Sequence, residues 1–97
     1  MNDSTSGGTD VIDNTERRRF ELAVDGQLAF ANYRMVGDAA HITHVETPVA
    51  LRGGGVAGRL MAGALAIIRA RGQKVKPVCP YAVAYIQRHP QEQDLLA

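Results

Sequence analysis

The sequence predicts an α/β domain of the α+β kind built on a mixed sheet. The expected order is a three-strand antiparallel meander, a helix, a parallel fourth strand and a short C-terminal helix. Three observations lead to this prediction. Apolar and polar residues alternate over residues 20–47, as they do in half-buried strands. From Val56 onward the apolar residues instead recur at the spacing of an amphipathic helix. After that helix, residues 73–78 again have the pattern of a strand.

Length and local composition set the domain limits. The chain has 97 residues, which corresponds to one domain. Residues 1–15 are mostly Ser, Thr, Gly, Asp and Asn, which offer little apolar surface to bury, and an arginine triplet follows at 17–19. We therefore predict a disordered N-terminal tail over residues 1–19 and a single domain over residues 20–97.

The first half of the domain contains turn residues at the spacing of a meander. Residues 20–24 form the first predicted strand, and Asp25-Gly26 after it is typical of a tight hairpin turn. Residues 27–36 form the second strand, and Gly37-Asp38 begins the next turn. Residues 39–47 complete the meander as a third strand.

The second half reads as helix, strand and helix. The helix begins at Val56, and Gly72 suits the position that stops it. Residues 73–78 form a fourth strand, and residues 81–88 form a short helix after Pro80. Because a strand–helix–strand passage is almost always a right-handed crossover, the third and fourth strands should lie side by side and parallel.

Composition argues against several classes of protein. A single cysteine permits no internal disulfide, which favours a reducing cytoplasm over secretion. No apolar run approaches the ~20 residues of a membrane span, and the N-terminal residues lack the pattern of a signal peptide. We therefore expect a cytoplasmic protein with no membrane partner.

The segment between Glu46 and Glu92 contains basic but no acidic residues, which indicates an anionic ligand or a solvated basic face.

A glycine-rich segment, Arg52-Gly53-Gly54-Gly55-Val56-Ala57, lies between the third predicted strand and the helix. The first N–H groups of a helix have no intrahelical partner, and the helix dipole adds partial positive charge there. Glycines allow a ligand to approach these groups closely. The segment therefore predicts a phosphate cradle, with a flexible turn as the alternative.

Other phosphate and nucleic-acid motifs fit this segment less well. Gly53-x-Gly55-x-x-Gly58 matches the dinucleotide fingerprint, but no acidic residue lies about 20 positions further on. The Gly-Lys-Ser/Thr of a Walker A loop is absent. The GxxG of a KH module joins two helices, whereas here a strand precedes it.

The segment also fits R/Q-x-x-G-x-G/A, and in this it resembles the pyrophosphate-binding loop of GNAT-type acetyltransferases. The resemblance extends over residues 20–90 and includes Ile42-Thr43-His44-Val45-Glu46-Thr47-Pro48, Val75-Lys76-Pro77-Val78-Cys79-Pro80-Tyr81 and His89-Pro90. The chain is thus similar to the small, single-cysteine subfamily of acetyl-CoA-dependent GNAT N-acetyltransferases, which implies a minimal GNAT-like mixed sheet. Gly54 departs from the family pattern, because a basic residue usually stands there.

The resemblance implies that acetyl-CoA binds between the third and fourth strands. Its pyrophosphate would then lie on Arg52, Gly53, Gly54, Gly55, Val56 and Ala57. Tyr81 and Tyr85 are four residues apart on the last helix, so they align on one face. They are candidates for contacts with the pantetheine arm, and ordinary helix–sheet packing is the alternative.

Three side chains are candidates for catalysis. In the subfamily, the cysteine that corresponds to Cys79 lies near the reactive end of the cofactor, where it could accept the acetyl group; an inert buried thiol is the alternative. His44 and Glu46 are two residues apart, so we expect them on one strand face together with Ile42. Either could act as a general base, or both could be ordinary surface residues.

The predicted function is that of an acetyltransferase that moves an acetyl group from acetyl-CoA to an amine of a small molecule or protein, as a monomer or homodimer. One alternative is a CoA- or acyl-CoA-binding module with little or no transfer activity, which Gly54 favours. A less favoured one is an RNA-binding module, because exposed aromatic residues for base stacking are lacking and no nucleic-acid partner is expected. His41 and His44 should point to opposite faces, and no metal site is expected.

Overall fold

The computed structural model describes residues 10–97 and contains one five-stranded sheet with the strand order β1-β2-β3-β4-β5. The first four strands pair antiparallel, and β5 pairs parallel with β4. The strands are β1 (Ile12–Asn14), β2 (Arg19–Val24), β3 (Gln27–Val36), β4 (Ala39–Glu46) and β5 (Lys74–Pro77).

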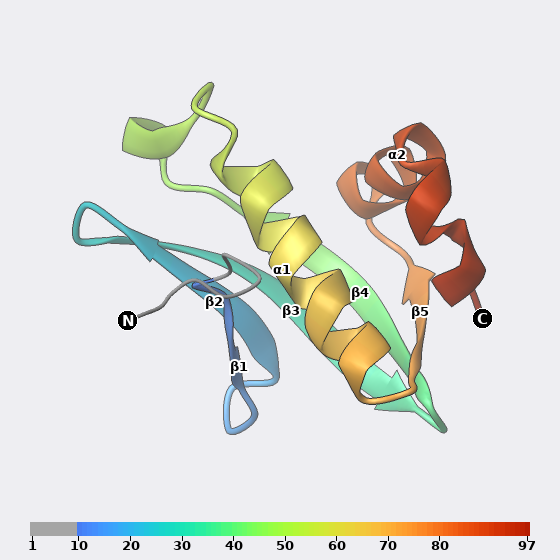
Figure 1. Cartoon of the computed structure of the whole chain (residues 1–97). Helices are drawn as coiled ribbons and strands as arrows, with labels where there is room; N and C mark the ends of the chain where they lie inside the picture. The colour runs from blue at the N-terminus through green and yellow to red at the C-terminus, as the bar shows by residue number, and fades with distance from the viewer. Residues whose placement is uncertain (1–9) are drawn as a thin grey trace.

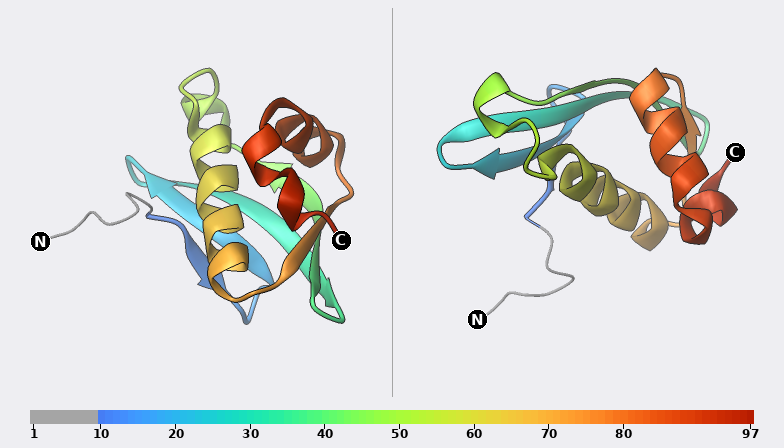
Figure 2. Two further views of the ribbon diagram at one scale, coloured as in Figure 1. Left: turned by 45° about the vertical axis from the view of Figure 1, so that its right-hand side comes forward. Right: turned by 90° about the horizontal axis from the view of Figure 1, so that it is seen from above.

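The helices lie on one side of this sheet. The long helix α1 (Val56–Ala70) crosses the sheet, and α2 (Pro80–Arg88) stands beside it near β5 (Figure 1). The view from above places both helices on the same side of the sheet (Figure 2). Two short 3-10 helices, η2 (Val49–Leu51) and η3 (Pro90–Leu95), precede α1 and follow α2.

The core fills the space between α1 and the sheet, because the apolar stripe of α1 meets the inward-facing strand residues. Its largest side chains, each less than 2% exposed, are Phe20, Leu22, Ile42, Leu60, Met61, Leu65, Ile68 and Val75. The predicted fold class is confirmed: a helix follows the antiparallel strands, and a parallel strand follows the helix. The predicted stop at Gly72 is also correct, since this residue has a left-handed φ of 67° just after α1.

Part of the N-terminal prediction is wrong. Residues 12–14 form β1 at the sheet edge instead of lying in a disordered tail, so the meander has a fourth antiparallel strand. The Asp13 carboxylate accepts hydrogen bonds from Tyr33 Oη and Arg71 Nη1, both at 2.7 Å. Val11 packs into the core. Polar contacts with distant residues therefore hold a strand whose own sequence has little apolar content. Residues 1–9 of the predicted tail lie outside the described residues.

A bulge in β4 changes which side chains share a face. Asn32 pairs with His44, whereas Tyr33 pairs with Ile42, so Thr43 is an extra residue in β4. Ile42 therefore faces the core, while His44 and Glu46 lie on the opposite face of the sheet. The expectation that Ile42 shares their face is wrong, because the extra residue reverses the alternation.

Candidate functional site

The glycine-rich loop holds two left-handed residues before α1. Gly53 has a φ of 85°, and Gly55, the N-cap of α1, has a φ of 78°. Glycine adopts this conformation without the steric cost that a side chain would add. The loop thus turns sharply from η2 into the first turn of α1.

The N-terminus of α1 presents backbone donors. Within residues 10–97, the N–H groups of Gly55, Val56, Ala57 and Gly58 donate to no acceptor, and the regular helical bonds begin with Arg59 N–H to Gly55 O at 3.1 Å. The first turn has no acidic residue, and no side chain caps it. Free donors combined with the positive end of the helix dipole fit a phosphate group.

A small cavity of about 170 Å³ lies against these donors. Its walls come from the glycine-rich loop and α1, from Thr47 and Leu51 before the loop, and from Tyr81 of α2. The Arg52 side chain, also in the wall, donates from Nε to Thr47 O at 3.2 Å and lies 3.9 Å from Glu46. Arg52 is therefore held toward β4, with 62% of its side chain exposed.

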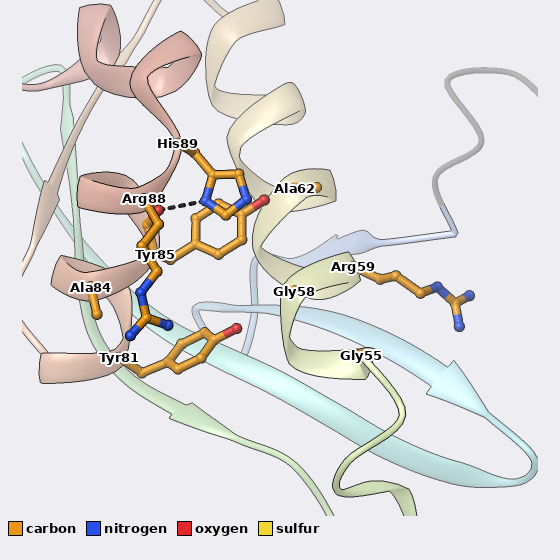
Figure 3. Close-up of a pocket in the computed structure, with 9 residues that line it drawn as sticks. All are labelled: Gly55, Gly58, Arg59, Ala62, Tyr81, Ala84, Tyr85, Arg88 and His89. Carbon is orange, nitrogen blue, oxygen red and sulfur yellow. Dashed lines mark hydrogen bonds between the residues drawn. The ribbon is translucent and has the colours of Figure 1, made fainter.

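A larger cavity of about 420 Å³ lies between α1 and α2 (Figure 3). It shares Gly55, Gly58 and Tyr81 with the smaller cavity, so the two cavities adjoin at the start of α1, and together they are called the groove below. Its full lining is Gly55, Gly58, Arg59, Ala62, Tyr81, Ala84, Tyr85, Arg88 and His89.

Aromatic rings form the α2 wall of the groove. The rings of Tyr85 and His89 stack at 3.9 Å between centroids, and His89 Nδ1 lies 2.6 Å from Tyr85 O (Figure 3). Burial raises the pKa of the Tyr81 phenol, and the positive charge of nearby Arg88 offsets part of this rise. Burial and the charge of Glu92 also raise the pKa of Tyr85. Both phenols therefore stay protonated at neutral pH and can donate hydrogen bonds.

Cys79 lies where β4 and β5 separate. The Ile42 carbonyl accepts two hydrogen bonds, from Val78 N–H at 2.9 Å and from Cys79 N–H at 3.1 Å. Beyond Ile42, β4 pairs only with β3. Cys79 Sγ accepts a hydrogen bond from Ala82 N–H at 3.4 Å, which makes the thiol the N-cap of α2. The thiol is half-buried and packs against the core.

His44 and Glu46 form a pair on the other face of the sheet. His44 Nε2 lies 2.9 Å from Glu46 Oε1, and their side chains are 55% and 42% exposed. Through Glu46 the pair is connected to Arg52 of the loop. Within residues 10–97, no hydrogen bond or ion pair joins either residue to Cys79.

Of the predicted site residues, those that line the two cavities are Arg52, Gly53, Gly55, Val56, Ala57, Tyr81 and Tyr85. Gly54 and Cys79 line neither cavity, and Cys79 and the His44–Glu46 pair lie on opposite faces of the sheet. Sequence reasoning missed Ala62, Arg88 and His89 as groove residues. The available signal was helical spacing, because Tyr81, Tyr85 and Arg88 recur on one face of α2, as do Gly58 and Ala62 on α1.

Two further properties concern the described residues alone. Residues 10–97 contain no group of three or more His, Cys, Asp or Glu side chains placed to hold a metal ion. No helix in this part of the chain has the length and apolar character needed to cross a membrane.

Comparisons with known proteins agree with this architecture. A structural search matches the NMR solution structure of a GCN5-like protein from Staphylococcus aureus with a TM-score of 0.67. The match covers 91% of this chain and 87% of that chain at 19% identity, so it concerns the fold. No match was found among curated protein sequences. The profile of the GCN5-related N-acetyl-transferase family matches residues 19–95. The chain therefore belongs to the GCN5-related N-acetyltransferase (GNAT) family.

Proposed function

We propose that this protein transfers an acetyl group from acetyl-CoA to an amine. The observation that carries the proposal is the set of free N–H groups from Gly55 to Gly58, which open onto a groove between α1 and α2. Residues 53–57 would hold the pyrophosphate of the coenzyme, with Arg52 beside them. When bound, acetyl-CoA would supply an acetyl group activated as a thioester.

Cys79 is the proposed acceptor of that acetyl group within the protein. Its Sγ lies at the N-terminus of α2 and accepts a hydrogen bond from the Ala82 N–H. The thiol sulfur would form a new thioester bond to the acetyl carbonyl while the bond to the coenzyme sulfur breaks, and the Cys79 proton would pass to that sulfur, so the coenzyme leaves as a thiol.

The His44–Glu46 pair is the proposed proton acceptor for the amine. An ammonium group must lose a proton before its nitrogen can attack a thioester. The two side chains share a hydrogen bond and are exposed, so they can take that proton and pass it to water. The amine would then attack the acetyl group on Cys79: the bond to Sγ breaks, an amide forms, and Sγ takes the second nitrogen proton and returns as the thiol. The amine would reach Cys79 through the opening between β4 and β5, which separate beyond Ile42.

The acceptor would be an amine of a small molecule or of a protein. We place the reaction in the cytoplasm, where the single thiol of Cys79 would stay reduced. Light scattering in solution would decide between a monomer and a homodimer.

The test combines coenzyme binding with turnover. We expect acetyl-CoA to bind the full chain in a calorimetric titration, and a panel of amines and lysine peptides to include acceptors that release free CoA thiol above the rate without amine. Absence of coenzyme binding would overturn the proposal. Clear binding without thiol release for any amine would instead support the alternative of a CoA-binding module, which the absence of a basic side chain at Gly54 favours.

A further inference from the structure

We propose that Arg88 binds the 3′-phosphate of coenzyme A and makes the site selective for coenzyme A over its 3′-dephospho form. This inference rests on the proposed function, and it assigns a ligand to a side chain of the groove that the reaction itself does not use. Arg88 occupies the last turn of α2 and lines the larger cavity, while the pyrophosphate donors stand at the start of α1 across the same cavity.

Arg88 is a cation without a protein partner. Within residues 10–97 it makes no ion pair or hydrogen bond, although two acidic residues follow α2 closely in sequence. Both of these, Glu92 and Asp94, are bound by Arg69 at 3.1 and 2.7 Å. The hydrogen bonds from Arg69 also keep the pKa of Asp94 below its usual value. The groove therefore keeps one guanidinium free of a carboxylate.

The direction of the side chain supports the assignment. Arg88 extends along the α2 wall so that its guanidinium lies between Tyr81 and Tyr85, whereas Arg59 points away from this wall (Figure 3). Arg59 also lies 3.9 Å from the carboxylate of Asp10. Of the two arginines that line the cavity, Arg88 is thus the one directed along the side opposite the pyrophosphate donors.

The chemistry of the ligand fits this position. Coenzyme A carries a phosphate monoester on the ribose that follows its pyrophosphate, so a second anion would lie near the first. A phosphate monoester has about −1.5 to −2 charge at neutral pH, and a guanidinium can bind its oxygens with two parallel hydrogen bonds. With Gly54 in place of a basic residue, the loop adds no further cation beyond Arg52 for this second phosphate.

The test compares two probes, coenzyme A and 3′-dephospho-coenzyme A, by calorimetry on the full chain. We expect the natural protein to bind coenzyme A about tenfold more tightly, the effect of one charge-assisted phosphate contact at an exposed site. Arg88→Gln should reduce this ratio to about twofold or less while leaving the affinity for the dephospho form nearly unchanged, because only the 3′-phosphate contact is lost. Arg34→Gln removes the same charge from β3, outside the groove, and should keep the tenfold ratio.

The outcomes separate this inference from the proposed function. If the natural protein binds both probes equally, or if Arg88→Gln keeps the preference, the inference is overturned and coenzyme binding stands. If Arg88→Gln lost affinity equally for both probes, Arg88 would be assigned to the pyrophosphate, and this result would also overturn the inference. If the natural protein binds neither probe, the proposed function itself fails. Circular dichroism of each variant would check that the fold is retained.

Discussion

The Sγ atom of Cys79 accepts a hydrogen bond from the backbone N–H of Ala82 at 3.4 Å, so the only thiol of the chain also caps the helix that forms one wall of the groove. An alanine at this position would therefore remove a nucleophile and a helix cap together. Serine keeps an acceptor at the cap and is a far weaker nucleophile, which allows the two roles to be separated.

We predict that Cys79→Ala lowers the free energy of unfolding by about 0.5–1 kcal/mol, the effect of losing a cap. Cys79→Ser should remain within about 0.5 kcal/mol of the natural protein, because a hydroxyl also accepts from Ala82 N–H. Urea unfolding measures both values. After incubation with acetyl-CoA and no amine, mass spectrometry should find one acetyl group on Cys79 of the natural protein and none on either variant. An unmodified natural protein with normal turnover would limit Cys79 to capping.

A second prediction concerns the backbone conformation at the start of α1. Gly55→Ala places a side chain at a φ of 78°, which costs about 1–2 kcal/mol. Relief of this strain would turn the free N–H groups away from their present direction, so we expect at least a tenfold loss in acetyl-CoA affinity. Gly26→Ala is a matched control, because Gly26 has a φ of 74° in the β2–β3 turn and, as at Gly55, an added Cβ would meet no atom within 4 Å.

The two variants should thus lose similar stability in thermal unfolding, and Gly55→Ala alone should lose affinity in a titration. An unchanged affinity in Gly55→Ala would mean that the donors of α1 do not hold the coenzyme.

A third prediction is a gain in affinity for acetyl-CoA from a substitution at Gly54. Its φ lies outside the left-handed region, and a Cβ there would meet Leu51 O at 3.5 Å, an ordinary contact. Gly54→Arg should therefore fold normally and place a guanidinium beside the phosphate donors. We expect acetyl-CoA to bind about three- to tenfold more tightly, and high salt to remove most of the gain. Gly54→Gln, which has a long but neutral side chain, is the control. An equal gain from the glutamine would show that charge is not the cause.

A fourth prediction separates the two histidines of β4. His44→Gln should lower kcat about 100-fold, the usual size of a general-base contribution, and should leave kcat/KM for acetyl-CoA nearly unchanged, because His44 acts only after Cys79 has been acetylated. His41→Gln changes a histidine that pairs with Arg34 and Lys76 at the other end of the strand, so it should keep normal kinetics. Rates of thiol release at several acetyl-CoA concentrations measure both constants. Equal rates for the two variants would remove His44 from the mechanism.

The parts of the fold that the sequence predicts correctly are those with strong local patterns. Residues 27–36 alternate over ten positions and match β3, and the helical spacing from Val56 matches the start of α1. The glycine-rich loop was also predictable, because left-handed positions before a helix favour glycine. These features depend on neighbours in sequence, which a pattern can reveal.

The parts that the sequence does not reveal depend on residues distant in sequence. Strand β1 is held by contacts of Asp13 with Tyr33 and Arg71, which are 20 and 58 positions away. The extra residue at Thr43 follows from the register of β3 against β4 and has no local marker. Arg88 joins the groove only because α2 packs beside α1. The sequence therefore predicts the phosphate end of the candidate site well and its other walls poorly.

The contact between Tyr33 and Asp13 leads to a pH-dependence prediction. Burial, together with the hydrogen bond to Asp13 and its negative charge, raises the pKa of Tyr33 from 10.0 to about 12. Between these two pH values the unfolded chain loses the phenolic proton while the folded protein retains it. The unfolded state then binds fewer protons, so the stability that Tyr33 contributes is complete below pH 10 and is lost as the pH rises toward 12.

Tyr33→Phe removes both the hydrogen bond and this titration. We expect the variant to be less stable than the natural protein at neutral pH, by about 1 kcal/mol for one hydrogen bond. The difference should shrink as the pH rises from 10 to 12, because only the natural protein carries the phenol. Urea unfolding of both proteins across this range measures the difference in the free energy of unfolding. The contributions of all other titrating groups are the same in both proteins and cancel in this difference. A constant difference would mean that Tyr33 ionises equally in both states, and that its contact with Asp13 does not shift its protonation.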